Sequence, residues 1–319
     1  MENNYISIII PNYNGMHHLE CCLASLRNQS YRNFRIIIVD NNSTDNSLEF
    51  VKKKYNEVLF IELKMNEGFA KAVNIGIKKA LQDKHTKYIL LLNNDIECDE
   101  YFVEELINGF NYENVGSVSP KMMNFFKRDI IDGAGDEVYR KKLPYPRGIG
   151  QKDTGQYSKI EYIFGACAGA AMYKKEVFKE IGFFDEDFFA YFEDVDYSFR
   201  LQYRGYKCIY FPAAICYHKR GGSFSTFQSF QTFLVERNIF SLRIKVYPLS
   251  VLLKYFIYYN LHSYYRIIKY FIIYTPNVSY AVLKGYIFGL FTIPGAIKKR
   301  INIQKNKKVN NKYIIGLMK

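Results

Sequence analysis

The sequence predicts an α/β protein with a mixed, mostly parallel sheet flanked by helices, followed by a helical extension at the C-terminus. Short apolar runs alternate with helical patterns in the first half of the chain, which is typical of βαβ units. Polar residues follow directly after three of these runs. After about Tyr247 the composition shifts to aromatic and aliphatic residues interspersed with Lys and Arg. A chain of 319 residues is long enough for one large α/β domain and an appendage.

The first four strands are expected at the apolar runs, with helices between them. We place the strands near Ile6–Ile10, Phe34–Val39, Val58–Ile61 and Tyr88–Leu92, and the helices near Leu19–Asn28, Ser47–Tyr55 and Phe69–Leu81. Ligands of such sheets bind outside the carboxyl ends of the strands. We therefore expect the polar residues after the strands to share one rim of a Rossmann-like nucleotide-binding half.

The pattern is weaker in the middle of the chain. Residues Lys121 to Lys159 are rich in Gly, Pro, Lys and Tyr, which predicts loops or a small insert that faces the substrate. Regular apolar and helical patterns return after Lys159. We expect an apolar run at Phe164–Tyr173, helices at Lys175–Ile181 and from Glu193 to Tyr203 with a stop at Gly205, a strand at Lys207–Phe211 and a further segment at Ala214–His218.

The net charge of +13 is confined to the C-terminal end. From Arg237 onward there are 15 of the 44 Lys and Arg residues and no Asp or Glu, which leaves 29 basic against 31 acidic residues before it. An acid-free, aromatic tail suits an anionic membrane surface better than a nucleic acid. Basic residues within Tyr247–Tyr274 predict an in-plane interfacial helix rather than a span. Val278–Ile297 has about spanning length but contains Lys284, so spanning, interfacial and buried helices all stay open.

The cysteines and the N-terminus predict a cytosolic protein. The six cysteines form no CxxC pair, so we expect reduced thiols. A strand begins within the first residues, so we expect no targeting segment there. No GxGxxG follows the first strand and there is no P-loop, which disfavours a Rossmann oxidoreductase.

Two polar segments and a histidine are candidates for binding a nucleotide and a metal ion. Asn93-Asn94-Asp95 follows a buried strand, and Asp95 is a candidate ligand of Mg²⁺ or Mn²⁺ together with diphosphate oxygens. Asp40 ends another strand, where it is a candidate acceptor for a pyrimidine imide N–H, with Tyr13 as a stacking face. Either segment is also compatible with plain turn or helix-capping chemistry. His218 is a candidate for completing the metal site, although a lone His is more often structural.

An acidic segment between Gly182 and Arg200 is the most informative part of the chain. Six carboxylates lie within the twelve residues from Asp185 to Asp196, interleaved with aromatic residues. Burying so many carboxylates costs free energy, so their retention suggests a function. The helix dipole alone would account for Glu193, Asp194 and Asp196 at a helix N-terminus. An acidic pair within aromatic walls also suits a general base that removes a proton from an acceptor hydroxyl.

Together these segments resemble the family two glycosyltransferases with the GT-A fold, especially their rhamnosyltransferase-like and galactofuranosyltransferase-like branch. Five motifs carry the resemblance in the expected order between Ile6 and Gly222. They are Ile-Ile-Ile-Pro-Asn-Tyr-Asn, Ile-Val-Asp-Asn-Asn-Ser-Thr-Asp, Asn-Glu-Gly-Phe-Ala-Lys-Ala-Val-Asn-Ile-Gly, Leu-Leu-Asn-Asn-Asp, and Phe-Phe-Ala-Tyr-Phe-Glu-Asp-Val-Asp followed by Tyr-His218. Five ordered motifs are far more specific than any one of them.

The resemblance implies a role for each motif. It implies that the nucleotide sugar contacts Pro11, Tyr13, Asp40, Ser43, Asn66, Gly68, Asn74 and Asn94. It implies that Asp95, the last residue of the family's DxD motif, binds the divalent cation with His218. Asp194 would be the catalytic base, with Glu193 assisting acceptor placement. Asn93 stands at the first position of the DxD motif, which makes strict metal dependence less certain.

The implied activity is an inverting transfer of a sugar from dTDP-rhamnose or a UDP-sugar to a glycan or polyprenyl-linked glycan acceptor in surface polysaccharide synthesis. We expect residues 1–240 to form the glycosyltransferase domain, with 1–119 binding the nucleotide sugar and 120–240 the acceptor. Residues 241–319 would hold the protein on the cytoplasmic face of the cell membrane. The oligomeric state is left open. The alternative is a catalytically inactive GT-A-like module that binds a nucleotide or a membrane surface.

Overall fold

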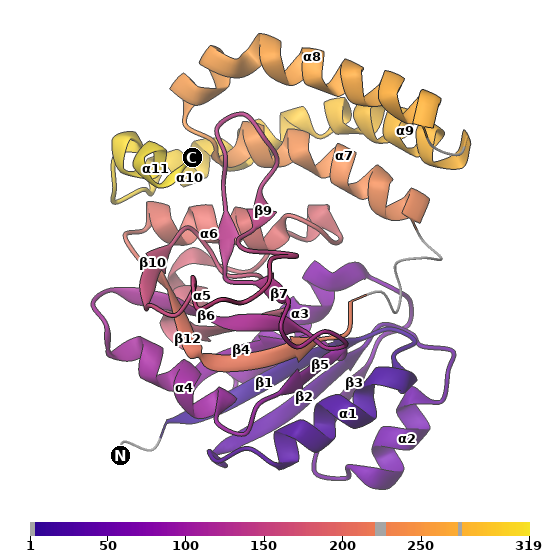
Figure 1. Ribbon diagram of the computed structural model, residues 1–319, viewed down its shortest axis with the longest axis vertical. Helices are drawn as coiled ribbons and strands as arrows, with labels where there is room; N and C mark the ends of the chain where they lie inside the picture. The colour runs from indigo at the N-terminus through magenta and orange to yellow at the C-terminus, as the bar shows by residue number, and fades with distance from the viewer. Residues whose placement is uncertain (1–3, 221–227, 274–275) are drawn as a thin grey trace.

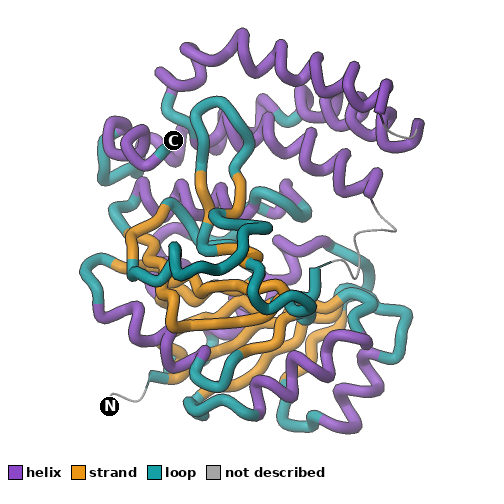
Figure 2. The backbone as a smooth tube through the Cα atoms, viewed as in Figure 1, coloured by secondary structure: helices purple, strands orange, loops and turns teal. Residues whose placement is uncertain are grey.

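The computed structural model describes residues 4–220, 228–273 and 276–319. A central sheet lies in the lower part of the molecule, with helices on both of its faces, and a layer of long helices covers the upper end (Figure 1). The strands are therefore inside and the helices outside, as the coloured backbone shows (Figure 2). The predicted mixed α/β fold with a C-terminal helical extension is confirmed.

The first half of the sheet consists of four parallel strands. They are β1 (Tyr5–Asn12), β2 (Phe34–Asp40), β3 (Leu59–Glu62) and β4 (Thr86–Leu92), joined by α1 (Met16–Arg27), α2 (Ser47–Lys54) and α3 (Gly68–Leu81). Their order in the sheet is β4-β1-β2-β3, with every neighbouring pair parallel. The carboxyl ends of these strands therefore lie on one edge, as the sequence predicted.

The second half of the sheet is mixed. Its strands are β5 (Ile96–Cys98), β6 (Val115–Asn124), β7 (Ile131–Gly133), β10 (Glu161–Ile163), β11 (Ala170–Lys174) and β12 (Lys207–His218), while β8 (Asp136–Glu137) and β9 (Tyr145–Pro146) form a separate pair. β11 runs antiparallel between β4 and β6, and β12 runs parallel to β6. The strand and the further segment predicted around Phe211 form one strand with an irregular register between Phe211 and Ile215.

Three helices accompany this second half: α4 (Phe102–Asn108), α5 (Lys175–Ile181) and α6 (Glu193–Tyr203). The bounds predicted for α5 and α6 are confirmed, and Gly205 ends the second of them with a φ of +83°. Short 3-10 turns occur at Gly109–Asn111 and Glu186–Phe188. The segment predicted as loops from Lys121 to Lys159 holds the end of β6 and also β7 to β9 besides loops, so the loop prediction is wrong for its first residues. It contributes buried residues to the site described below.

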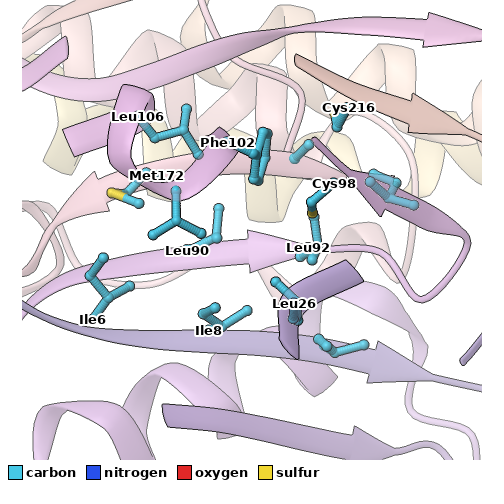
Figure 3. Close-up of a cluster of buried hydrophobic side chains, with 14 of the residues drawn as sticks. Ile6, Ile8, Leu26, Leu90, Leu92, Cys98, Phe102, Leu106, Met172 and Cys216 are labelled. Atoms are coloured by element: carbon cyan, nitrogen blue, oxygen red, sulfur yellow. The ribbon is translucent and has the colours of Figure 1, made fainter. Parts of the chain in front are cut away.

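Two apolar cores fix the sheet. One lies between the sheet and the helices α1, α2 and α4, where side chains such as Ile8, Leu26, Leu90 and Phe102 are fully buried (Figure 3). The other lies between the opposite face and α3, α5 and α6. Alternate residues of β1 enter the two cores, Ile8 the first and Ile9 the second, because successive side chains of a strand point to opposite faces. This double burial explains the continuous apolar runs in the sequence.

The C-terminal region consists of α7 (Gln228–Val246), α8 (Leu249–Ile273), α9 (Pro276–Phe291), α10 (Ile293–Lys305) and α11 (Asn311–Leu317). α8 forms the outermost layer, over α7 and α9 (Figure 1). No single helix in the described part of the chain is long and apolar enough to cross a membrane. α9 and α10 meet that test only as a pair, which is bent by 53°. α7 runs continuously across residue 240, so the domain boundary predicted there stays a prediction.

Candidate functional site

Asp40 lies at the carboxyl end of β2, where neighbouring side chains already hold its carboxylate. Asn12 at the end of β1 donates to Oδ1 over 2.7 Å, and the hydroxyl of Ser43 donates to the same atom over 2.6 Å. The backbone N–H of Ser43 donates to Oδ2 over 2.8 Å. Because β1 and β2 pair in register, Pro11 and Tyr13 flank the same point, and Tyr13 keeps 40% of its surface exposed. The predicted base-binding residues therefore share one rim.

A side-chain hydrogen bond links this rim to the turn after β4. Nδ2 of Asn94 donates over 2.7 Å to Oδ1 of Asn12. Nδ2 of Asn12 in turn donates to Asp40. The turn after β4 can lie this close to the start of α1 only because residue 15 is a glycine. A Cβ at that position would lie 2.0 Å from Nδ2 of Asn94. Asn94 was predicted to contact the nucleotide sugar, and here it connects that rim with the neighbouring Asp95.

The remaining predicted nucleotide contacts divide into two groups. Asn66 is exposed and accepts from the N–H of Gly68, which has a φ of +82° and lies against the ring of Phe189. Asn74 is buried and faces away from the rim. Its amide donates to the carbonyl of Phe184 over 2.9 Å and accepts from the N–H of the same residue over 3.0 Å. Asn74 thus joins α3 to Phe184 in the segment before α6, and these two residues lie 110 positions apart in the chain.

The predicted metal ligands, Asp95 and His218, lie side by side. β12 pairs with β5 so that His218 lies opposite Ile96, and Nε2 of His218 is 3.2 Å from Oδ2 of Asp95. Oδ1 of Asp95 is buried and has no hydrogen-bond partner in the described part of the chain. Burial by itself would raise the pKa of Asp95, but the hydrogen bond from His218 holds it below its usual value.

Asp132 on β7 holds the other side of the His218 ring, with its Oδ2 lying 2.8 Å from Nδ1. Burial lowers the pKa of His218, but the hydrogen bonds to Asp132 and Asp95 outweigh burial and raise it to about 9. Arg220 also reaches Asp132, with 2.5 Å between Nε and Oδ1. Sequence reasoning missed Asp132 and Arg220, because Asp132 lies in the stretch with weak periodicity and Arg220 carries no motif of its own.

Once His218 has lost its Nε2 proton, Asp95 and His218 would fit a divalent cation as a pair completed by its other ligands. An unpartnered carboxylate oxygen beside an imidazole nitrogen, with the second ring nitrogen on a carboxylate, is the common arrangement at metal-binding histidines. Mg²⁺ and Mn²⁺ typically take one or two protein carboxylates and complete their shell with phosphate oxygens and water. No group of three or more His, Cys, Asp or Glu side chains is placed to hold a metal in residues 4–220, 228–273 and 276–319. A cation held by this pair would therefore need further ligands from bound molecules or water.

A cavity of about 640 Å³ adjoins this pair and contains the predicted catalytic residues. Glu193 and Asp194 enter it from the N-terminus of α6, and Asp136 enters from β8. Aromatic and proline side chains form much of the rest of the wall, including Phe69, Tyr145, Tyr191 and Phe192. The structure thus brings Asp95, His218, Glu193 and Asp194 together around one space.

The carboxyl groups in this cavity differ in their hydrogen bonds. Asp194 accepts from the backbone N–H of Val195 over 2.8 Å and from that of Ala168 over 3.3 Å. Burial raises the pKa of Asp194, and these hydrogen bonds oppose the rise. Burial and the charge of Asp194 raise the pKa of Glu193 well above its usual value. A buried carboxylate with a raised pKa is suited to accept a proton.

Asp196, the third acidic residue of α6, has a structural role. It is fully buried and forms ion pairs with Arg200 over 2.8 Å and with Lys245 over 2.7 Å. Helix-terminal electrostatics and ion pairing therefore account for Asp196, whereas Glu193 and Asp194 face the cavity. This distinction between neighbouring carboxylates was not available from the sequence.

The backbone before α6 is strained. Phe189, Tyr191 and Phe192 all have positive φ angles, of 63°, 71° and 69°, which bulky residues rarely adopt. Asn238 on α7 holds this segment, with Nδ2 within 2.8 to 2.9 Å of the carbonyl oxygens of three residues: Phe188, Ala190 and Tyr191. α7 therefore supports the wall of the cavity. Asn238 is a further residue that the sequence reasoning missed.

A mixed sheet with a polar rim at its strand ends and a carboxyl-lined cavity beside it is the architecture of a GT-A glycosyltransferase. The chain belongs to glycosyl transferase family 2, whose family model matches residues 7–182.

Named relatives agree with this assignment. Poly-beta-1,6-N-acetyl-D-glucosamine synthase of Staphylococcus aureus is 28% identical over 217 residues, which cover 66% of this chain and 49% of that protein. The chain thus spans about half the length of that relative. The low-salt glycan biosynthesis hexosyltransferase Agl10 of Haloferax volcanii is 22% identical over 249 residues, or 77% of this chain and 78% of that protein.

Two solved structures share the fold. S. aureus TarS superimposes with a TM-score of 0.51 at 20% identity and covers 75% of this chain and 39% of its own. GalNAc-T7, solved with UDP, GalNAc and Mn²⁺, superimposes with a TM-score of 0.58 at 16% identity and covers 77% of this chain and 51% of its own. At such identities the likeness concerns the fold alone.

Proposed function

We propose that this chain is an inverting glycosyltransferase that uses a nucleoside-diphosphate sugar and builds a glycan. The observation that carries the proposal is the cavity in which Glu193 and Asp194 share one space with Asp95 and His218. A base and a candidate cation site must lie on either side of a reacting sugar for direct displacement, and this cavity is lined by both. GalNAc-T7 binds UDP and Mn²⁺ on a similar fold, which supports a divalent cation and a pyrimidine nucleotide here.

Each residue has a defined task in the proposed mechanism. Asp40 and Tyr13 bind the base, while Asp95 and His218 hold the cation, which when bound neutralises charge on the diphosphate. Asp194 takes the proton of an acceptor hydroxyl as its oxygen attacks the anomeric carbon. The bond from that carbon to the diphosphate oxygen breaks on the opposite face, so the anomeric configuration inverts in one displacement.

The donor we favour is dTDP-rhamnose or a UDP-sugar such as UDP-galactofuranose, since each offers a pyrimidine imide to Asp40. This choice follows the motif resemblance to the rhamnosyltransferase-like and galactofuranosyltransferase-like branch. For the acceptor we favour a polyprenyl-linked glycan of surface polysaccharide synthesis, because the region beside the cavity exposes a large apolar surface on α8 and α9.

We further propose that α8 to α10 hold the protein peripherally on the cytoplasmic face of the cell membrane. Large apolar side chains such as Leu253, Phe256, Ile257 and Ile272 are 64 to 77% exposed on α8. Monomeric soluble proteins rarely expose so many apolar residues along one element. An acid-free, basic sequence after Glu236 suits an anionic leaflet. Release from membranes by high salt alone would support peripheral binding, whereas retention until detergent is added would favour a span by α9 and α10.

The deciding experiment is a panel of nucleotide sugars with membrane lipid extract as acceptor source, with and without Mn²⁺ or Mg²⁺. We expect one donor to turn over with metal in the wild type and in the control Asp129→Asn, whose carboxylate is 59% exposed. In Asp194→Asn we expect turnover to fall by about 10²- to 10⁴-fold, while nucleotide binding persists.

Two outcomes contradict the proposal. If Asp194→Asn is as active as the wild type, Asp194 is not the base. If no donor turns over in any combination while nucleotides still bind, the chain is the nucleotide-binding or membrane-surface module that the sequence left as the alternative.

A further inference from the structure

Asp136 is a buried carboxyl group for which the proposed mechanism has no task. It lies in β8, where its backbone N–H donates to the carbonyl of Gly165 over 2.9 Å. The residue is only 8% exposed, and its Oδ2 has no hydrogen-bond partner within the described residues. It lines the same cavity as Glu193 and Asp194. A buried, unpartnered polar atom in a binding cavity indicates a missing ligand contact.

The three carboxyl groups of the cavity disfavour one another's ionisation, because they are buried and carry like charges when ionised. Asp194 is the group whose ionised form receives two backbone N–H groups. Burial, followed by the charge of Asp194, raises the pKa of Asp136 well above its usual value. The charge of Arg220 acts in the opposite direction, but its Nε is bound to Asp132.

The other titratable groups around Asp136 do not stabilise its charge. They come from α6, from the turn before β11 and from β12, and they are Glu193, Asp194, Cys167 and Cys208. Burial raises the pKa of both thiols, so each stays neutral. The surroundings of Asp136 therefore favour its protonated form, in which a carboxyl group both donates and accepts a hydrogen bond.

We propose that Asp136 stays a neutral carboxylic acid and donates a hydrogen bond to an oxygen of the acceptor sugar, next to the hydroxyl that Asp194 deprotonates. The inference rests on the proposed function and adds an acceptor-binding residue to it. It also defines the chemistry of the acceptor at this point as a neutral, oxygen-bearing group such as a hydroxyl or ring oxygen, because a neutral acid offers no charge to a cationic amine.

The first test needs no ligand. A carboxyl whose pKa is raised by folding stabilises the folded protein below its unfolded pKa of about 3.9, and this stabilisation is lost as the pH rises through the folded pKa. Asp136→Asn is neutral at every pH, so its melting temperature should rise relative to that of the wild type between about pH 4 and pH 8.

Asp153→Asn is the matched control with the opposite sign. The hydrogen bond from Lys121 lowers the pKa of Asp153, so its stabilisation is complete above the unfolded pKa of about 3.9. This variant should therefore melt below the wild type by a constant margin between about pH 4 and pH 8. If Asp136→Asn behaves like Asp153→Asn, Asp136 is ionised in the folded protein and the inference is wrong. Where Asp136→Asn does not fold, Asp136→Ala gives the same comparison.

The second test measures transfer with the donor found in the panel and membrane lipid extract as acceptor source. Asp136→Asn keeps a hydrogen-bond donor, so we expect kcat to stay within about threefold of the wild type. Asp136→Ala should raise the KM for the acceptor about tenfold, while the KM for the donor and the hydrolysis of the donor by water stay unchanged.

These outcomes separate the inference from the proposed function. A loss in Asp136→Asn as large as that in Asp194→Asn would make Asp136 an ionised catalytic group and overturn the inference alone. An equal rise in both KM values in Asp136→Ala would also overturn it. A wild type that turns over no donor contradicts the proposed function and, with it, the acceptor contact.

Discussion

In the sheet half of the molecule apolar side chains are inside and polar ones stand at the strand ends, whereas α7 buries charged side chains beside its apolar ones and α8 exposes many apolar side chains. Ile8, Ile9 and Leu90 are fully buried in the two cores of the sheet. In the helical region Glu236 and Lys245 are 2% and 3% exposed, while Leu253, Ile257 and Ile272 are 70% to 77% exposed.

This difference indicates that the two halves meet different surroundings. The sheet half buries the apolar side chains of its strands between its own helices. The helical half buries charges only where partners neutralise them, as Arg266 does for Glu236 through an ion pair between α8 and α7. No part of the described chain packs against the outer apolar face of α8. This exposure supports our proposal that the face contacts a lipid surface.

The largest expected effect concerns the charged contact between the halves. Lys245 on α7 bonds Asp185 over 2.6 Å and Asp196 over 2.7 Å, and all three are buried. Lys245→Met leaves two carboxylates with one partner fewer, so we expect the free energy of unfolding to fall by about 3 to 5 kcal/mol. Urea denaturation measures this free energy of unfolding.

Lys308→Met is the control, because it removes an exposed partner of Glu180. This variant should lose less than about 1 kcal/mol of stability. Equal losses in the two variants would contradict a special role for the buried contact.

The outer face of α8 should matter for membranes and not for folding. Phe256 is 64% exposed, and burying a side chain of this size in lipid contributes about 1.5 to 3 kcal/mol. We expect Phe256→Glu to weaken binding to anionic liposomes about 10- to 100-fold in a flotation assay, with an unchanged melting temperature. Met65→Glu changes an equally exposed residue on the sheet half and should leave binding unchanged; equal effects would remove the distinction between the two surfaces.

A smaller effect is expected at the polar rim of the sheet. Asp40→Asn removes the charge that we propose accepts the imide N–H of the base, and a hydrogen bond to a charged group contributes about 1.5 to 3 kcal/mol. Titration calorimetry with UDP and dTDP should show Kd raised at least about tenfold. Asp129→Asn is the control. An unchanged Kd in Asp40→Asn would place the base elsewhere.

The smallest effect is the pH dependence of the contact between the halves. Although burial opposes it, the charges of Lys245 and Lys299 hold the pKa of Asp185 well below its usual value. A lowered carboxyl pKa stabilises the fold above the unfolded pKa of about 3.9, and this stability is lost as the pH falls towards the folded pKa. The melting temperature of the wild type should therefore fall below about pH 4, and Lys299→Met should make that fall shallower. An identical pH profile in Lys299→Met would exclude this ion pair as its cause.

The sequence by itself determined the order of elements in the sheet half and much of the candidate site. Strands buried on both faces produce continuous apolar runs, and the residue after each run must lie at a strand end, so the positions of Asp40 and Asp95 followed from local pattern. The helix α6 was predictable for a similar reason, because Gly205 ends it and acidic residues begin it.

Only the tertiary structure decided which polar residues meet. Asp132 and Asp136 come from a stretch without periodicity. The hydrogen-bond partner of Asp132, His218, and the carboxyl group that shares the cavity with Asp136, Asp194, lie far away in the chain. Asn74 has a motif position of a ligand-binding residue, but long-range packing gives its amide to Phe184. In α8 apolar residues occur on every side, so the sequence pattern could not tell the packed face from the exposed one. Burial depends on what packs against a residue, and that information is not local.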